Sequence, residues 1–146
     1  MIRISVTRTV PIGPIPTETF VRGSTMVLKG EKKRHARIHA IILNDGKIRK
    51  INEKFLHHNG ATDVITFPLE SEPVLEAEIY ISVDTARRQA KNFHVSLTNE
   101  LMRLTMHGLL HLCGYDDGSE RDRLRMRGKE NFYVETFFSR SKKKHL

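Results

Sequence analysis

Residues 78–93 read EIYISVDTARRQAKNF, and this stretch decides the fold. Ile79 and Ile81 alternate with polar or larger side chains, which is the period of two that a half-buried strand shows. Asp84 then favours the start of a helix, and apolar residues such as Ala90 recur at helical spacing. A strand that passes directly into a helix indicates an α/β class of domain.

The rest of the chain extends this alternation to nine elements in the order β-α-β-α-β-β-α-α-α, with no internal repeat and no linker. We expect strands at residues 2–7, 38–43, 62–68 and 78–83 and helices at 17–28, 48–55, 84–93, 96–113 and 119–138. Thr17 is the expected cap of the first helix, Ser96 or Thr98 that of the fourth, and Ser119 that of the last. We expect residues 38–43 to form a central strand covered on both faces, Pro68 to end its strand, and residues 70–76 to form an acidic loop. These elements predict one domain over residues 1–146, of α/β (α+β-like) class: a mixed sheet of about four strands covered by about five helices. Residues 139–146 form a basic tail that we expect to fray.

Composition excludes several classes of protein. The chain has 146 residues and one cysteine, so an intramolecular disulfide is excluded. No apolar run approaches the ~20 residues that span a bilayer, and the alternating N-terminus does not look like a signal peptide. We therefore expect a soluble, cytoplasmic protein without a membrane partner.

The net charge of +8 is unevenly distributed along the chain. Residues 1–60 carry 12 Lys+Arg and 4 Asp+Glu, whereas residues 61–146 carry 13 of each. A basic surface favours a polyanionic partner such as nucleic acid, although many small proteins are basic for solubility alone. The first part of the chain is thus the expected phosphate-holding surface.

The chemistry is concentrated in MHGLLHLCGYDD, residues 106–117. His107 and His111 are spaced i, i+4 on a predicted helix, so both imidazoles leave the same face. Gly114 ends the helix and turns the chain, which brings an aspartate back within reach. Two histidines and a third ligand leave one coordination position open, as in catalytic zinc sites.

Other interpretations of this segment remain. An H-x-x-x-H pair alone is a weak signal, because such histidines are often ordinary core residues. Cys113 lies about 200° around the helix from His111 and is expected to be a small buried hydrophobe rather than a ligand or nucleophile. Metalloproteases carry H-E-x-x-H with the glutamate as general base, and here Gly108 occupies that position.

The segment resembles the bacterial YbeY family of rRNA maturation endoribonucleases, whose pattern is H-G-x-L-H-L-x-G-Y-D-H. The segment TDVITFP at residues 62–68 and EIYIS at 78–82 resemble two further motifs of the family, and the resemblance covers roughly residues 38–133. It implies a metallohydrolase that binds one Zn²⁺ through His107, His111 and Asp117, with water or a phosphate oxygen at the fourth position. It also implies structural support of the site by four residues: Asn52, Thr62, Asp63 and Gly114.

Two departures from the family pattern matter. The third family histidine falls on Asp117, with Asp116 as the alternative ligand, and a carboxylate ligand also suits iron or manganese. Many family members carry an RNA-contacting arginine after the aromatic residue at position 55, where this chain has Leu56. Substitute RNA contacts could come from six residues: Arg49, His58, Lys32, Lys33, Arg34 and Arg37.

The resemblance implies a metal-dependent endoribonuclease in small-subunit rRNA 3′ end maturation and ribosome quality control. Its partners would be ribosomal RNA, ribosomal particles and ribosomal proteins. A non-catalytic assembly factor with a structural metal is the main alternative. A peptide hydrolase is a third, which Gly108 disfavours.

Overall fold

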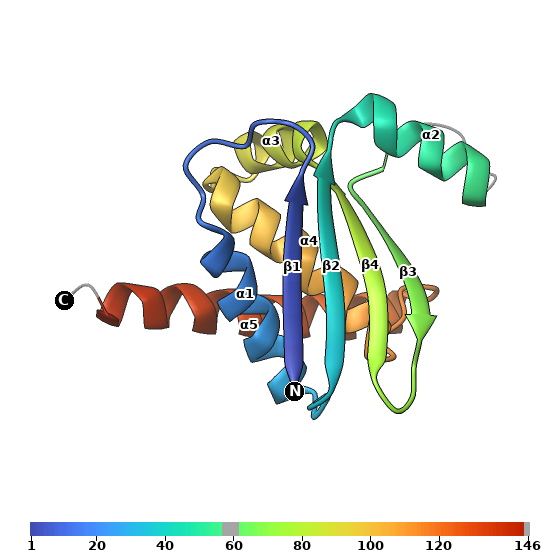
Figure 1. Ribbon diagram of the computed structural model, residues 1–146. Coiled ribbons are helices and arrows are strands. Elements are labelled where there is room, and N and C mark those ends of the chain that lie inside the picture. Colours follow the sequence, from blue (N-terminus) through green and yellow to red (C-terminus); the bar gives the residue numbers. More distant parts are fainter. Residues whose placement is uncertain (57–61, 145–146) are drawn as a thin grey trace.

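The elements follow the expected order along the chain. The structure is a computed structural model that describes residues 1–56 and 62–144, with side chains through residue 140. Its elements are β1 (Ile2–Arg8), α1 (Thr17–Gly30), β2 (Ala36–Leu43), α2 (Asp45–Leu56), β3 (Val64–Glu70), β4 (Leu75–Ser82), α3 (Val83–Asn92), α4 (Leu97–Leu112) and α5 (Glu120–Lys144). They form the predicted single domain with a mixed four-stranded sheet and five helices (Figure 1).

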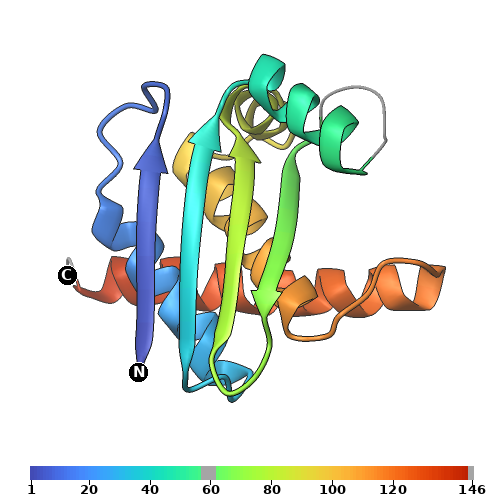
Figure 2. The same cartoon turned by 45° about the vertical axis from the view of Figure 1, so that its right-hand side comes forward.

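The strands lie in the order β1-β2-β4-β3, as Figure 2 shows in the turned view. β1 and β4 both pair in parallel with β2, whereas β3 pairs antiparallel with β4. Pro68 does not end β3 as expected, because it sits opposite Ala77 and the strand continues to Glu70. A proline is tolerated there because β3 is an edge strand, so its missing N–H breaks no interior ladder.

One face of the sheet is covered by α1, α4 and α5, and the main core lies there (Figure 1). Inward side chains of β2 and β4, including Ile42 and Ile79, meet fully buried residues of α4 such as Leu101 and Leu109. Alternate residues on each strand supply this face because successive side chains of a strand point to opposite sides.

The opposite face is covered only in part, by α2. Ile41 and Leu43 of β2 form a small second cluster there with Ile48 and Ile65. The expected burial of β2 on both faces is thus confirmed toward the end of the strand, whereas Arg37 near its start is exposed.

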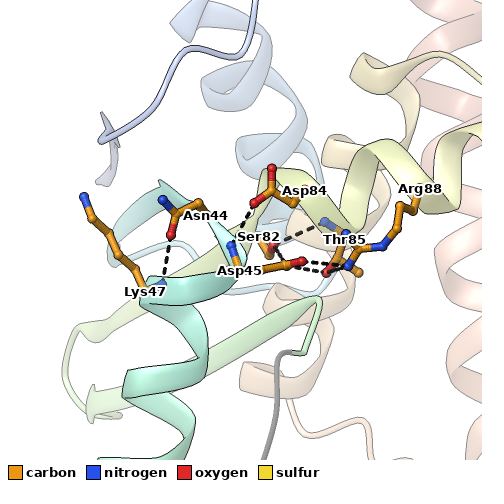
Figure 3. Close-up of polar contacts among 7 residues, drawn as sticks. All are labelled: Asn44, Asp45, Lys47, Ser82, Asp84, Thr85 and Arg88. Carbon is orange, nitrogen blue, oxygen red and sulfur yellow. Dashed lines mark hydrogen bonds and ion pairs between the residues drawn. The ribbon is translucent and has the colours of Figure 1, made fainter.

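A polar network joins the first turns of α2 and α3 (Figure 3). Ser82 caps α3 by accepting a hydrogen bond from the Thr85 N–H, and Asp84 instead accepts from the N–H of Asp45. The expected cap at Asp84 is therefore wrong, because the cap lies two residues earlier, at Ser82, and Asp84 lies inside the helix and turns toward α2. The Asp45 carboxylate accepts from the Ser82 and Thr85 hydroxyls and from Arg88. Burial alone would raise the pKa of Asp45, but these hydrogen bonds and the Arg88 charge lower it overall.

The remaining helix ends differ slightly from expectation. α1 has Pro16 rather than Thr17 at its N-cap and runs to Gly30, and α5 continues past residue 138 to Lys144. Ser96 rather than Thr98 caps α4, and the predicted cap at Ser119 is confirmed, since each serine hydroxyl accepts a hydrogen bond from the N–H three residues ahead. Across the described ranges, none of the helices combines the length and apolarity that crossing a bilayer requires.

Candidate metal centre

Helix α4 presents two imidazoles side by side. His107 and His111 are one turn apart, and their ring centroids are 4.8 Å from each other. The helix that carries them begins at the Ser96 cap and packs against the sheet through its buried leucines, so its register is fixed by the core. The i, i+4 arrangement predicted from the sequence is confirmed.

The turn after α4 returns a carboxylate to these histidines. Gly114 has φ +103°, in the left-handed region that glycine adopts without strain, and it follows the helix end at Cys113. Asp117 Oδ2 then lies 3.4 Å from His111 Nε2. One potential ligand atom from each of His107, His111 and Asp117 lies within 4.8 Å of the other two.

The alternative ligand, Asp116, is placed differently. Its side chain is exposed, and its Oδ1 accepts a hydrogen bond from the Asp117 N–H at 2.8 Å. Asp116 does not belong to the ligand group found among the described residues. The geometry therefore favours Asp117 over Asp116.

Glu130 of α5 orients one of the histidines and was missed by the sequence reasoning. Its Oε2 lies 2.6 Å from His107 Nδ1, which leaves Nε2 as the free ring nitrogen. Arg103 approaches the other Glu130 oxygen at 3.5 Å and donates to Asn131 at 2.9 Å. A carboxylate on a histidine nitrogen fixes the tautomer and ring orientation of a metal ligand. One sequence feature could have identified Glu130 as a site residue. It lies one helical turn after buried Met126, on the inward side of α5.

Several carboxylates set the electrostatics of His107. Burial alone would lower its pKa, but the hydrogen bond and charge of Glu130, together with the charges of Asp63 and Asp117, raise it overall. The negative potential of these carboxylates also favours a metal cation at this point.

A second acid, Glu100 of α4, lies deep beside this group. Its side chain is 2% exposed. Burial, with the charges of Asp63 and Glu130, raises its pKa to about 7 despite the opposing charge of Arg103. Glu100 is therefore largely protonated below neutral pH.

Two cavities flank the candidate ligands and share Asp63, His107 and Asp117. The larger, of about 580 Å³, lies between α4, α5 and the end of α3. The smaller, of about 420 Å³, is lined by β3, by the predicted support residues Asn52 and Thr62, and by Leu56. Asn52 is buried on α2, and Asp63 accepts from Gln89 at 3.3 Å. Three of the four predicted support residues, Asn52, Thr62 and Asp63, thus line a cavity beside the candidate ligands.

The predicted RNA contacts that the structure describes do not line these cavities. Lys32, Lys33, Arg34 and Arg37 lie after α1 and on β2, where Arg37 pairs with Glu76 at 2.7 Å. Arg49 is exposed on α2, and His58 lies outside the described residues. The cations that line the larger cavity come from the electrically balanced part of the chain: Arg103, Arg123 and Arg127.

Two further positions bear on the chemistry. A Cβ at Gly108 would lie 3.0 Å from Thr66 Cγ2 and 3.1 Å from Ile79 Cγ2, so this position packs against the sheet and has no room for a glutamate base. Cys113 packs partly buried against the main core, and burial raises the pKa of its thiol to about 11. Neither residue supplies a base or a thiolate.

The donor set fits a zinc ion. Two imidazoles and a carboxylate are a common catalytic ligand set, and tetrahedral zinc with bonds of about 2 Å places its ligand atoms about 3.3 Å apart. The separation of 3.4 Å between His111 and Asp117 agrees with that spacing. A small movement of His107 would complete the set, since the atoms already lie within 4.8 Å.

Comparison with known proteins identifies the family of the chain. A family model described as Endoribonuclease YbeY matches residues 15–137. The chain belongs to the YbeY endoribonuclease family. The Endoribonuclease YbeY of Chloroherpeton thalassium is 41% identical over 129 residues, which cover 88% of this chain and 92% of the relative. That of Chlorobium phaeovibrioides is 39% identical over 120 residues, or 82% and 81% of the two chains.

A solved structure has a similar fold. The solution structure of TM1509 from Thermotoga maritima superposes with a TM-score of 0.63 at 26% identity. The match covers 99% of this chain and 93% of that one. The YbeY match extends from just before α1 into α5, so it includes His107, His111, Asp117 and Glu130.

Proposed function

We propose that this chain is a Zn²⁺-dependent endoribonuclease that matures ribosomal RNA, acting at the 3′ end of the small-subunit RNA and in ribosome quality control. The observation that carries the proposal is the convergence of His107, His111 and Asp117 between two open cavities, in a chain of the YbeY family. Its partners would be ribosomal RNA, ribosomal particles and ribosomal proteins, and it would act in the cytoplasm.

The protein residues would divide the work as follows. The metal would be held by His107, His111 and Asp117. Glu130 would keep His107 in the tautomer whose Nε2 can bind the metal. When bound, zinc would supply a Lewis acid for a phosphoryl oxygen of the RNA. The two cavities would receive the strand on either side of the cleaved bond. An aspartate in place of a third imidazole lowers the charge of the centre by one, and it also suits iron or manganese.

Metal analysis tests the ligand set. We expect one equivalent of zinc in the purified protein and almost none in His107→Ala/His111→Ala. The variant His35→Ala/His39→Ala removes two imidazoles from around the start of β2 and should retain the metal. Wild-type zinc content in the first variant would exclude the site.

RNA cleavage tests the activity. We expect metal-replete protein to cut a single-stranded rRNA fragment and metal-free protein to regain cleavage when zinc is restored. Equal cleavage with and without chelator would indicate a contaminating nuclease. Binding to ribosomal particles without turnover would instead support an assembly factor.

A further inference from the structure

The larger cavity beside the candidate metal centre carries two arginines on one face of α5. Arg123 and Arg127 are one turn apart, both are exposed, and both line the cavity. Arg123 donates to the backbone carbonyl of Asp117 at 3.3 Å, so its guanidinium lies next to a candidate ligand. Arg127 takes part in no hydrogen bond or ion pair within the described side chains. These two guanidinium groups therefore retain donors for an anionic ligand.

The other charged groups of this cavity are already engaged, or, in the case of Asp117, belong to the candidate metal ligands. Arg103 donates a hydrogen bond to Asn131 and forms an ion pair with one oxygen of Glu130. The second oxygen of Glu130 is hydrogen-bonded to Nδ1 of His107. Asp63 accepts from Gln89, and Glu100 is almost fully buried. The cations that face solvent at this cavity are thus Arg123 and Arg127.

An aromatic ring completes the lining. Phe93 follows α3, is 64% exposed and borders the same cavity. Its ring stacks on no aromatic or cationic group among the described side chains, so one face is free. Exposed aromatic rings beside cations are typical of single-stranded nucleic-acid sites, because bases stack on them whatever their sequence.

We propose that this cavity is a nucleotide subsite for the RNA, in which a base stacks on Phe93 and a backbone phosphate binds Arg123 and Arg127. A volume of about 580 Å³ is within the range of small-ligand pockets. The position of Arg123 beside Asp117 places the bound phosphate next to the metal ligands. The smaller cavity has neither lysine nor arginine among its described lining residues. The phosphates of the RNA would therefore be bound by the arginines of α5. This inference rests on the proposed function.

The helix offers a matched control for the arginines. Arg121 and Arg125 have the same i, i+4 spacing but point about 200° away and do not line the cavity. Arg123→Gln/Arg127→Gln and Arg121→Gln/Arg125→Gln therefore remove the same charge from opposite faces of α5. Binding of a fluorescent single-stranded RNA would be measured across a salt series.

We expect the cavity-facing pair to weaken binding and to reduce the log–log salt slope by about 0.7 for each phosphate that the protein no longer neutralises. The control pair should change neither markedly. Phe93→Ala should weaken binding about 5- to 150-fold. Phe132→Ala, which removes an exposed ring lining a different groove, should not. Zinc content should stay at the wild-type value in all four variants. Each arginine pair loses one contact, Arg123 with the Asp117 carbonyl and Arg125 with the Tyr115 ring at 5.1 Å, so the melting temperature of each pair is measured before binding is compared.

The outcomes separate this inference from the proposed function. If the wild type neither binds nor cleaves RNA, the proposed function is wrong. If the wild type binds RNA and the two arginine pairs weaken it equally, the subsite is wrong and the function stands. If the cavity-facing double variant is unstable, RNA binding by the single variant Arg127→Gln tests the subsite instead. The Arg127 side chain makes no hydrogen bond or ion pair within the described part of the chain, so its loss should not affect stability.

Discussion

Replacing Glu100 by glutamine should remove a large pH dependence from the stability of the metal-free protein. The Glu100 carboxyl is 2% exposed and its pKa is raised to about 7 by burial and by the charges of Asp63 and Glu130, with Arg103 opposing. In the unfolded chain the same carboxyl titrates near its ordinary value of 4.5. The folded state therefore keeps a proton that the unfolded state releases as pH rises between these two values.

The sign and size of the effect follow from this difference. The contribution of Glu100 to stability is fully present below pH 4.5 and is lost as pH rises through 7. One pKa unit corresponds to about 1.4 kcal/mol, so raising the pH from 5 to 8 should cost about 2–3 kcal/mol of unfolding free energy. Glutamine keeps the shape and carries no charge, so Glu100→Gln should lack this loss and be the more stable protein at pH 8.

The assay is urea unfolding followed by circular dichroism at several pH values from 5 to 8, with a chelator present. The chelator is needed because a bound cation would lower the pKa of nearby carboxyls. Glu53→Gln, at an exposed position of α2, is the matched control and should follow the wild type. If the unfolding free energies of the wild type and Glu100→Gln change with pH by the same amount, the reasoning is refuted.

Three further predictions concern other parts of the molecule. Glu130→Gln should weaken zinc binding about 10- to 100-fold in a competitive chelator titration, because His107 loses its orienting carboxylate; unchanged affinity would show that the contact is incidental. Asp45→Ala should lower the unfolding free energy by about 2–3 kcal/mol, since it leaves two hydroxyls and Arg88 without their acceptor. A decrease below about 0.5 kcal/mol would contradict that role. Leu109→Ala, at a fully buried position, should cost about 2–5 kcal/mol in urea unfolding, and a neutral result would mean that α4 is not the core helix described.

Local patterns made most of the fold predictable. The alternation around Ile79 and the helical stripe around Ile48 depend on neighbouring residues only, so they indicated strand and helix correctly. The spacing of His107 and His111 is likewise a local property of a helix. The prediction that Pro68 ends its strand was wrong because the effect of a proline depends on whether the strand lies at a sheet edge, which is a property of the assembled sheet.

The parts of the site that come from distant segments could not be predicted in the same way. Glu130 reaches His107 from another helix, 23 residues away, and no spacing rule links them. The charge count along the chain also pointed to the first 60 residues, yet the arginines of the larger cavity come from α4 and α5. Linear charge does not report which side chains folding brings to one cavity.

The candidate ligands all lie within residues 107–117, at the end of one helix and in the turn that follows. An ion held there would close only a short loop, so it would remove little chain entropy from the unfolded state. It would not join distant segments, unlike the zinc of small domains that unfold without metal. Local opening of the turn at Gly114 would let the ion exchange while the sheet stays intact. The protein could therefore gain or lose its activity with metal supply while remaining folded.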